Sequence, residues 1–82
     1  MNKIKILFFA TMRTRAKRSS MELKIPKEIS IADFKDILIV EIPALEASLH
    51  HTLFSINKEY AFDEDIIPEN AEIALFPPVS GG

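Results

Sequence analysis

Two short apolar runs with alternating side chains, one near each end of the chain, constrain the fold most strongly. Residues 4–9 read Ile-Lys-Ile-Leu-Phe-Phe, and residues 73–76 read Ile-Ala-Leu-Phe. A period of two with branched and aromatic side chains is typical of β-strands. These are the most apolar strands of the chain, so we expect them to pair with each other in the middle of a sheet. The chain after residue 76 then leaves from the centre of that sheet.

Further strands are predicted between these two. Residues 21–25 alternate apolar and charged side chains and are followed by Pro26, which ends the strand. The first two strands are then a hairpin with a long connection. Residues 54–56 mark a third strand, the turn at 57–59 ends it, and residues 60–62 form a short returning strand.

Two charged segments are expected to be loops. Residues 11–20 are polar and basic, and residues 63–71 are acidic. Ile66 and Ile67 are expected to anchor the second loop. The chain has no low-complexity tract, no internal repeat and no linker that would divide it.

One main helix is predicted in the middle of the chain. Ser30 is a preferred N-cap residue, and Asp33 resembles the second half of a capping box. Pro43 ends or kinks this helix and can start a short helical segment over residues 44–49. The apolar side chains expected on one face of the main helix are Ile31, Phe34, Ile37, Leu38 and Val40.

Strands grouped around one helix predict an α+β domain in which the helix covers one face of the sheet. We expect residues 1–82 to form a single domain, with residues 77–82 as a flexible C-terminal tail. A chain of 82 residues is near the lower size limit at which one core holds a fold unaided.

Composition narrows the classes of function. The net charge of −2 argues against a dedicated nucleic-acid binder, which is usually strongly basic. The absence of cysteine excludes a disulfide framework, a zinc knuckle and a cysteine nucleophile. The apolar run at the N-terminus is too short and too charged for a membrane span or a signal peptide. We therefore expect a soluble protein of the cytoplasm with no membrane partner.

No metal site is predicted. His50 and His51 are adjacent, so they cannot share one face of a helix or strand as a ligand pair would. The acidic residues within 59–65 lack the spacing of an EF-hand loop, and we expect them to be solvated.

Alternation also predicts where the aromatic side chains point. Phe8 on the helix side places Phe9 on the opposite face of the sheet, and an inward Leu75 places Phe76 outward. Tyr60, after the turn, can join them. An exposed apolar patch of this kind usually marks an interface. The alternative is that loops cover these rings.

The end of the chain has the composition of a reactive tail. Gly81 and Gly82 have no Cβ, so they make a thin strand of backbone that can enter a narrow slot. Pro77 and Pro78 stiffen the exit from the domain, and Ser80 keeps the approach small. A free carboxylate is a chemical handle, because an acyl-adenylate can form on it. The alternative is an ordinary frayed terminus.

Particular residues along the chain match a known family. They are Phe8-Phe9-Ala10 followed by Arg13, then Asn57, and the final run from Glu72 to Gly82. With these the chain resembles the small, sulfur-carrying subunits of molybdopterin synthase, of the MoaD/ThiS type. The resemblance implies a ubiquitin-like β-grasp fold, with a mixed sheet of about four to five strands and one main helix on one face. The family usually has Gly-Asp where this chain has Asn70-Ala71, and Asn is the next residue to tolerate positive φ there.

The resemblance also implies a chemical cycle. An E1-like activating enzyme would adenylate the carboxylate of Gly82 with ATP, and a sulfur donor would convert it to a thiocarboxylate. The tail would then enter the large subunit of the synthase and give its sulfur to precursor Z to form the molybdopterin dithiolene. On this reading the chain binds no cofactor itself, and it is active only as part of a heterotetramer whose catalytic pocket lies on the large subunit.

Partner-binding residues follow from the same resemblance. Arg13 matches the family's arginine after Phe-Phe-Ala and would meet acidic groups on the activating enzyme, although a solvated arginine is an equal alternative. The remaining residues expected to bind partners are Phe9, Tyr60, Phe76, Pro77, Pro78, Val79 and Ser80.

Other carriers share the Gly-Gly ending. A sulfur carrier for thiamine thiazole synthesis or tRNA thiolation is one alternative, and the Phe-Pro-Pro lead-in favours the molybdopterin branch. A protein modifier joined to lysines through Gly82 is the alternative from another class.

Overall fold

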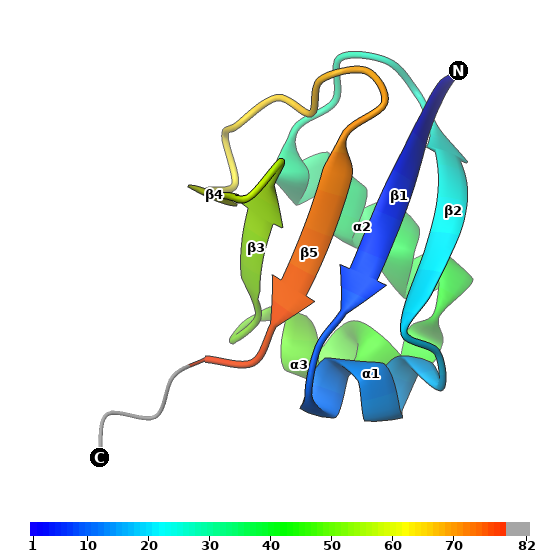
Figure 1. Cartoon of the computed structure of the whole chain (residues 1–82), viewed down its shortest axis with the longest axis vertical. Helices are drawn as coiled ribbons and strands as arrows, with labels where there is room; N and C mark the ends of the chain where they lie inside the picture. The colour runs from blue at the N-terminus through cyan, green and yellow to red at the C-terminus, as the bar shows by residue number, and fades with distance from the viewer. Residues whose placement is uncertain (79–82) are drawn as a thin grey trace.

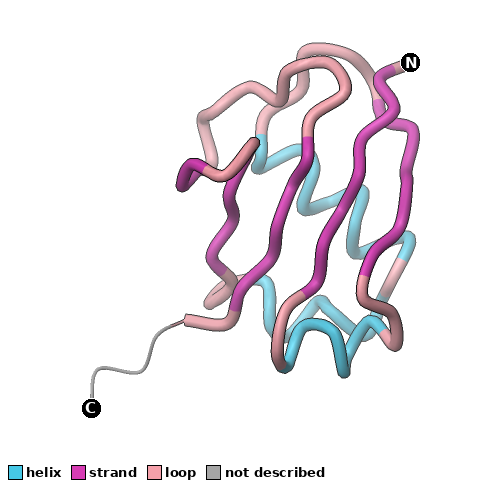
Figure 2. Tube along the Cα trace, in the orientation of Figure 1, coloured by secondary structure: helices cyan, strands magenta, loops and turns pink. Residues whose placement is uncertain are grey.

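The structure is a computed structural model that describes residues 1–78 of the chain. It consists of five short strands and several helical segments (Figures 1 and 2). In chain order they are β1 (Asn2–Phe8), α1 (Thr11–Ala16), β2 (Ser20–Ile25), α2 (Ile31–Glu41), the 3₁₀ turn η1 (Pro43–Leu45), α3 (Glu46–Leu49), β3 (Leu53–Ile56), β4 (Glu59–Ala61) and β5 (Glu72–Phe76).

The five strands form one mixed sheet in the order β2-β1-β5-β3-β4. Strands β1 and β5 are its parallel pair, with Ile6 opposite Ile73 and Phe8 opposite Leu75. The pairs β1–β2, β3–β4 and β3–β5 are antiparallel. The prediction that the first and last strands pair in the middle is therefore confirmed, and the backbone after β5 leaves from the centre of the sheet (Figure 1).

One face of the sheet carries the core. Alternate side chains of β1 and β5 point toward α2, which crosses behind the sheet (Figure 1). The ring of Phe34 on α2 meets the ring of Phe54 on β3 edge-on, with ring centroids 6.3 Å apart. Side chains buried to 2% exposure or less include Ile4, Ile6, Phe8, Ile25, Ile31, Phe34, Leu38, Leu45, Ile73 and Leu75.

Helix α2 begins as its sequence predicts. The backbone N–H of Asp33 donates to Ser30 Oγ at 3.2 Å, and the N–H of Ser30 donates to Asp33 Oδ2 at 3.5 Å, which completes the capping box. The prediction that Val40 joins the apolar face is wrong, because its side chain is 77% exposed. Val40 follows the buried Leu38 by two positions, and residues two apart on a helix point to different sides.

The basic segment after β1 is helical where a loop was expected. Residues 11–16 form α1, and Met12 and Ala16, four positions apart, are both buried. This i, i+4 pair packs one face of a short helix and leaves its basic side chains in solvent. Lys17 takes a left-handed conformation with φ of 60° and its N–H donates to Arg13 O, which ends the helix.

Two smaller predictions, the bounds of the returning strand and the burial of the loop anchors, differ from the structure. The returning strand β4 covers residues 59–61, one position earlier than expected. Only one of the two predicted anchors of the acidic loop is buried: Ile67 is 2% exposed, whereas Ile66 is 55% exposed. Ile66 lies in an isolated bridge with Ser30, so its neighbour points inward and it points outward.

Asparagines shape the two turns beside β5. Asn57 and Lys58 have φ of 50° and 73°, and these two successive positive values suit a tight two-residue hairpin. Asn57 Oδ1 also accepts the N–H of Glu72 at 2.9 Å, which fastens this hairpin to the start of β5. Asn70 has φ of 58°, as expected for a residue in place of glycine, and its N–H donates to Asn2 Oδ1 at 2.8 Å.

Helix lengths also bear on membrane insertion. Among residues 1–78, none of the helices has the length and apolar composition that a membrane crossing requires.

Ala10 between β1 and α1 provides a stability test. Its φ of 51° and ψ of −125° are disfavoured for a residue with a Cβ. Ala10→Gly should raise the free energy of unfolding by roughly 0.5–1 kcal/mol, because the relief of strain exceeds the entropy that glycine loses on folding. Urea titration measures the change. The matched control, Ala16→Gly inside α1, should lower it by about 1 kcal/mol. A loss of stability in Ala10→Gly would contradict the backbone geometry.

Candidate functional site

The face of the sheet opposite α2 carries the candidate site. The strand register places Leu7, Ala74, Ser55 and Tyr60 side by side across β1, β5, β3 and β4. These residues alternate with core residues, so their side chains point away from the helix. The helices leave this face open to the viewer in Figure 1, and we refer to it as the open face.

Two phenylalanines stack at the end of the open face from which the chain leaves the sheet. The ring centroids of Phe9 and Phe76 lie 5.1 Å apart with an interplanar angle of 5°. The N–H of Phe9 donates to Leu75 O at 3.1 Å, which holds the residue after β1 beside β5. Phe9 is 42% exposed and Phe76 is half-buried. The predicted outward direction of both rings is therefore confirmed.

The stacked pair forms one wall of a shallow hollow of about 390 Å³. Its floor contains the small side chains of Ser55 and Ala74, whereas the rings and Tyr60 are large and stand around them. Tyr60 is 71% exposed, so it joins the patch as predicted. An open apolar hollow of this size suits an apolar side chain of a partner protein. Its lining residues are Leu7, Phe9, Ser55, Lys58, Tyr60, Glu72, Ala74 and Phe76.

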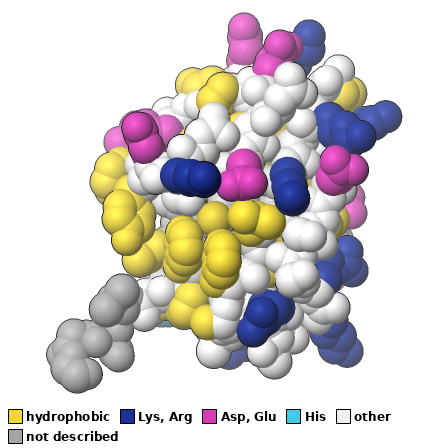
Figure 3. All heavy atoms as spheres, viewed as in Figure 1, with side chains coloured by type: hydrophobic (Ala, Val, Ile, Leu, Met, Phe, Trp, Pro, Cys, Tyr) yellow, Lys and Arg dark blue, Asp and Glu magenta, His cyan; other side chains and the backbone are white. Residues whose placement is uncertain are grey.

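Charged side chains border the apolar part of the open face. Lys5 lies opposite Glu72 across β1 and β5, and Lys58 lines the hollow with Glu72. Figure 3 shows hydrophobic side chains gathered on the lower left of this face, with basic and acidic side chains above them. An apolar centre with a polar rim is the usual arrangement of a protein–protein interface.

The root of the tail lies beside this hollow. β5 ends at Phe76, Pro77 is half-buried and Pro78 is exposed. The two prolines line a groove of about 260 Å³ together with residues of α1 and of the segment around α3, including Arg15 and His51. The predicted site residues Val79, Ser80, Gly81 and Gly82 lie outside the described residues.

Arg13 lines neither the hollow nor the groove of the two prolines. It lies on α1 with an exposed side chain, and its backbone carbonyl accepts the N–H groups of Lys17 and Arg18. The structure thus brings Phe9, Phe76 and the root of the tail to one end of the open face, with Tyr60 at the β4 side of the hollow and Arg13 on the helix next to it.

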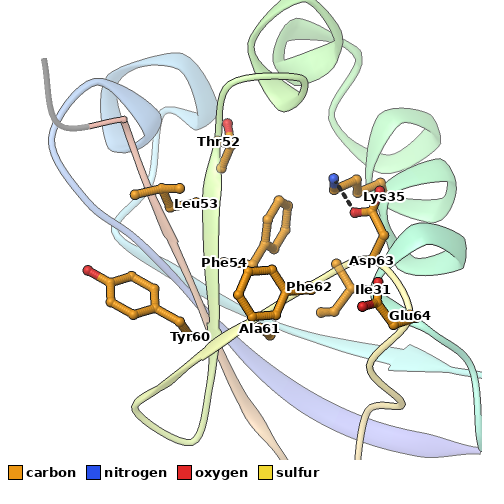
Figure 4. A pocket seen from close by; sticks show the side chains of 10 residues that line it. All are labelled: Ile31, Lys35, Thr52, Leu53, Phe54, Tyr60, Ala61, Phe62, Asp63 and Glu64. Atoms are coloured by element: carbon orange, nitrogen blue, oxygen red, sulfur yellow. Dashed lines mark hydrogen bonds and ion pairs between the residues drawn. The ribbon is translucent and has the colours of Figure 1, made fainter.

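A second, larger hollow of about 590 Å³ was not predicted. It lies between β4 and α2, where Lys35 Nζ is 2.6 Å from Asp63 Oδ1 and 5.3 Å from the centroid of the Phe54 ring (Figure 4). The rings of Phe62 and Tyr60 also line it, and Phe62 is 66% exposed. The sequence feature that could have indicated this hollow is Phe62, an aromatic residue just beyond β4. The hollow itself depends on how the acidic loop packs, which the sequence pattern does not specify.

The charged residues form no cation site in the part of the chain that the structure describes. Among residues 1–78, no three side chains of His, Asp or Glu come together in a way that could hold a metal ion.

Comparisons with known proteins agree with the resemblance seen in the sequence. The model of the ThiS family matches residues 6–82. A molybdopterin synthase sulfur carrier subunit from Dictyostelium discoideum is 36% identical over 88 residues, covering 99% of this chain and 98% of the relative. The one from Arabidopsis thaliana is 33% identical over 79 residues, covering 96% of this chain and 82% of the relative.

Solved structures match over nearly the whole chain. SAMP1 (small archaeal modifier protein 1) from Haloferax volcanii is 27% identical, with a TM-score of 0.85 and coverage of 98% of this chain and 99% of that one. A putative molybdopterin converting factor, subunit 1, from Pyrococcus furiosus has a TM-score of 0.86 with coverage of 96% and 100%. At 17% identity it is informative for the fold alone. The predicted ubiquitin-like β-grasp fold is confirmed.

The stacked rings give a direct test of the open face. In a double-mutant cycle, Phe9→Ala and Phe76→Ala should be coupled by about 0.5–1.5 kcal/mol in the free energy of unfolding, because each change removes the same ring contact. Urea unfolding of the four proteins measures the coupling. The matched cycle of Phe9→Ala with Phe62→Ala should be additive. Additivity in both cycles would show that the rings do not stack in solution.

Proposed function

Because the chain belongs to the ThiS family, we propose that it is the sulfur-carrying subunit of a molybdopterin synthase. One observation carries the proposal: the central strand β5 leads directly from an exposed aromatic patch into the tail. A carrier needs both parts. The patch positions the partner, and the fixed exit directs the tail into the partner's pocket.

The proposed reaction takes place on the carboxylate of Gly82. The activating enzyme joins this carboxylate to the AMP part of ATP and releases pyrophosphate, which creates a good leaving group. A sulfur donor then displaces AMP and leaves a thiocarboxylate. In the large subunit this sulfur displaces an oxygen leaving group from a carbon of precursor Z, and water then cleaves the bond between the sulfur and the terminal carbonyl carbon, which leaves the sulfur on the product and returns the end of the tail to a carboxylate. The chain needs no cysteine for this chemistry, since the sulfur is held on the terminal carbonyl carbon.

The activating enzyme and the large subunit are both proposed to bind the open face. Burial of the exposed parts of Phe9, Phe76 and Tyr60 against a partner removes apolar surface from water, and the charged rim sets the orientation. Pro77, Pro78, Val79 and Ser80 would line the entrance to the partner's pocket. The catalytic pocket itself belongs to the large subunit, where the sulfur acceptor binds.

Protein modification is a second candidate, because SAMP1 is 27% identical over nearly the whole chain. Both functions need an activated carboxylate at Gly82 and differ in the nucleophile that attacks it. A lysine ε-amine would give an isopeptide bond, whereas a sulfur donor gives a thiocarboxylate. Carriers for thiamine thiazole synthesis or tRNA thiolation would differ only in the final acceptor.

Intact mass separates a sulfur carrier from a protein modifier, and the molybdopterin assay then separates the carriers by their final acceptor. After incubation with ATP, the activating enzyme and a sulfur source, the chain should gain the mass difference of one sulfur atom replacing one oxygen atom, located in its C-terminal peptide. Conjugates of higher mass on lysines would instead support the modifier. Molybdopterin formation by a chain that lacks Gly82 would refute the carrier proposal.

A variant with one alanine added after Gly82 tests the role of the terminal carboxylate without removing a residue. This variant should keep the thermal midpoint of the parent chain, because the addition lies beyond the core, and it should support no molybdopterin formation. A reconstituted synthase assay measures the activity. An unchanged rate would contradict the role of the terminal carboxylate.

The open face has its own test. Phe76→Ala should weaken the affinity for the large subunit by about tenfold or more, since large apolar side chains at the centre of an interface carry most of its binding energy. Phe62→Ala, the same change outside the hollow, should leave the affinity unchanged. Titration calorimetry measures both. Equal losses in the two variants would place the interface elsewhere.

A further inference from the structure

Charge is distributed very unevenly along this chain. Eight of its ten lysines and arginines lie within residues 1–27, which contain one of its twelve acidic residues, Glu22. The basic part folds into β1, α1 and β2, and the acidic part supplies the rest of the sheet and α2. A net charge of −2 therefore conceals a basic side and an acidic side.

The strongest basic cluster lies at the end of α1, and we call it the α1 corner. It comprises Arg13, Arg15, Lys17 and Arg18, all with exposed side chains. In Figure 3 dark blue side chains gather around this part of the molecule, at the lower right.

The α1 corner is not neutralised by the described part of the chain. The ion pairs within residues 1–78 are Lys3–Glu22, Lys27–Glu69 and Lys35–Asp63, and none involves the corner. Of the four corner side chains, only Arg18 makes a hydrogen bond to residues 1–78, from its Nε to Ala16 O at 3.3 Å, with a contact of 3.9 Å to Met21 Sδ.

The helix dipole of α1 accounts for part of this positive charge. The last carbonyls of α1 favour positive charge nearby, and such an effect fades within one turn. Arg13 and Arg15 lie in the last turn of α1, but Lys17 and Arg18 follow the helix, so the four cations exceed what so short a helix needs, and like charges this close repel one another. A surface on which cations repel one another without compensation is suited to binding a negatively charged surface of another molecule.

The corner also adjoins the exit of the tail. Arg15 lines the same groove as Pro77 and Pro78. Charges within about one Debye length, roughly 8 Å in physiological salt, act on a partner far more strongly than charges farther away. A partner that binds the root of the tail therefore lies next to Arg15 of the corner.

We propose that the α1 corner docks on an acidic surface of the large subunit beside the pocket that receives the tail. This inference rests on the proposed function and extends it. The acidic side of the chain is repelled by the same surface, so the carrier approaches with its tail forward. Attraction of this kind acts mainly on the association rate.

Stopped-flow association with the large subunit at several salt concentrations tests the proposal. The corner variant carries Arg15→Gln, Lys17→Gln and Arg18→Gln, and it keeps Arg13. Its association rate constant should fall by about tenfold at low salt and approach that of the parent at high salt. The control variant carries Lys3→Gln, Lys24→Gln and Lys27→Gln, which removes equal charge at the other end of β1 and β2. It should associate like the parent.

The outcomes separate the inference from the proposed function. The inference would be overturned if both variants associated equally slowly, or if the association rate constant of the parent did not depend on salt concentration. Sulfur transfer by the parent chain in a single turnover tests the proposed function on its own, and the corner variant should match it at saturating concentration. If the triple variant unfolds, Arg15→Gln and Lys17→Gln measured singly should each slow association, and no slowing in either would overturn the inference.

Discussion

The parallel pairing of β1 with β5 is the contact on which the rest of the structure depends. It joins the two ends of the described chain, places Ile6 beside Ile73 and Phe8 beside Leu75, and gives α2 a surface to cover. The same pairing sets Leu7 beside Ala74 on the open face. One register therefore determines both the core and the candidate site, since a slip of one residue would exchange the two faces.

Local patterns predicted the parts of the fold that local physics determines. Alternation gave the central strands and the outward rings of Phe9 and Phe76, and the capping box gave the start of α2. Helix α1 was missed because its basic residues obscure the buried pair of Met12 and Ala16. Burial of Ile67 in preference to Ile66 could not be predicted either, since it follows from a bridge to a residue far away in sequence.

The sequence predicted the face of the sheet on which the candidate site lies, but it did not predict the shape of that site. Alternation and the outward rings implied an apolar patch beside the tail, whereas the hollow depends on the small side chains that meet across β3 and β5. The charge of the α1 corner is visible in the sequence as a basic run. Its closeness to the tail is not, because the groove that joins Arg15 to Pro77 forms only when the strands and helices pack.

The floor of the hollow has a consequence for how carriers of one fold are kept apart in a cell. Ala74 is a small residue on the face opposite the core, so its size can change while the buried contacts of β5 stay the same. A bulkier side chain there would fill the hollow and exclude a partner whose anchor enters it, and a complementary change in that partner would restore the fit. A substitution at this single position can thus change which partner fits while the fold stays the same.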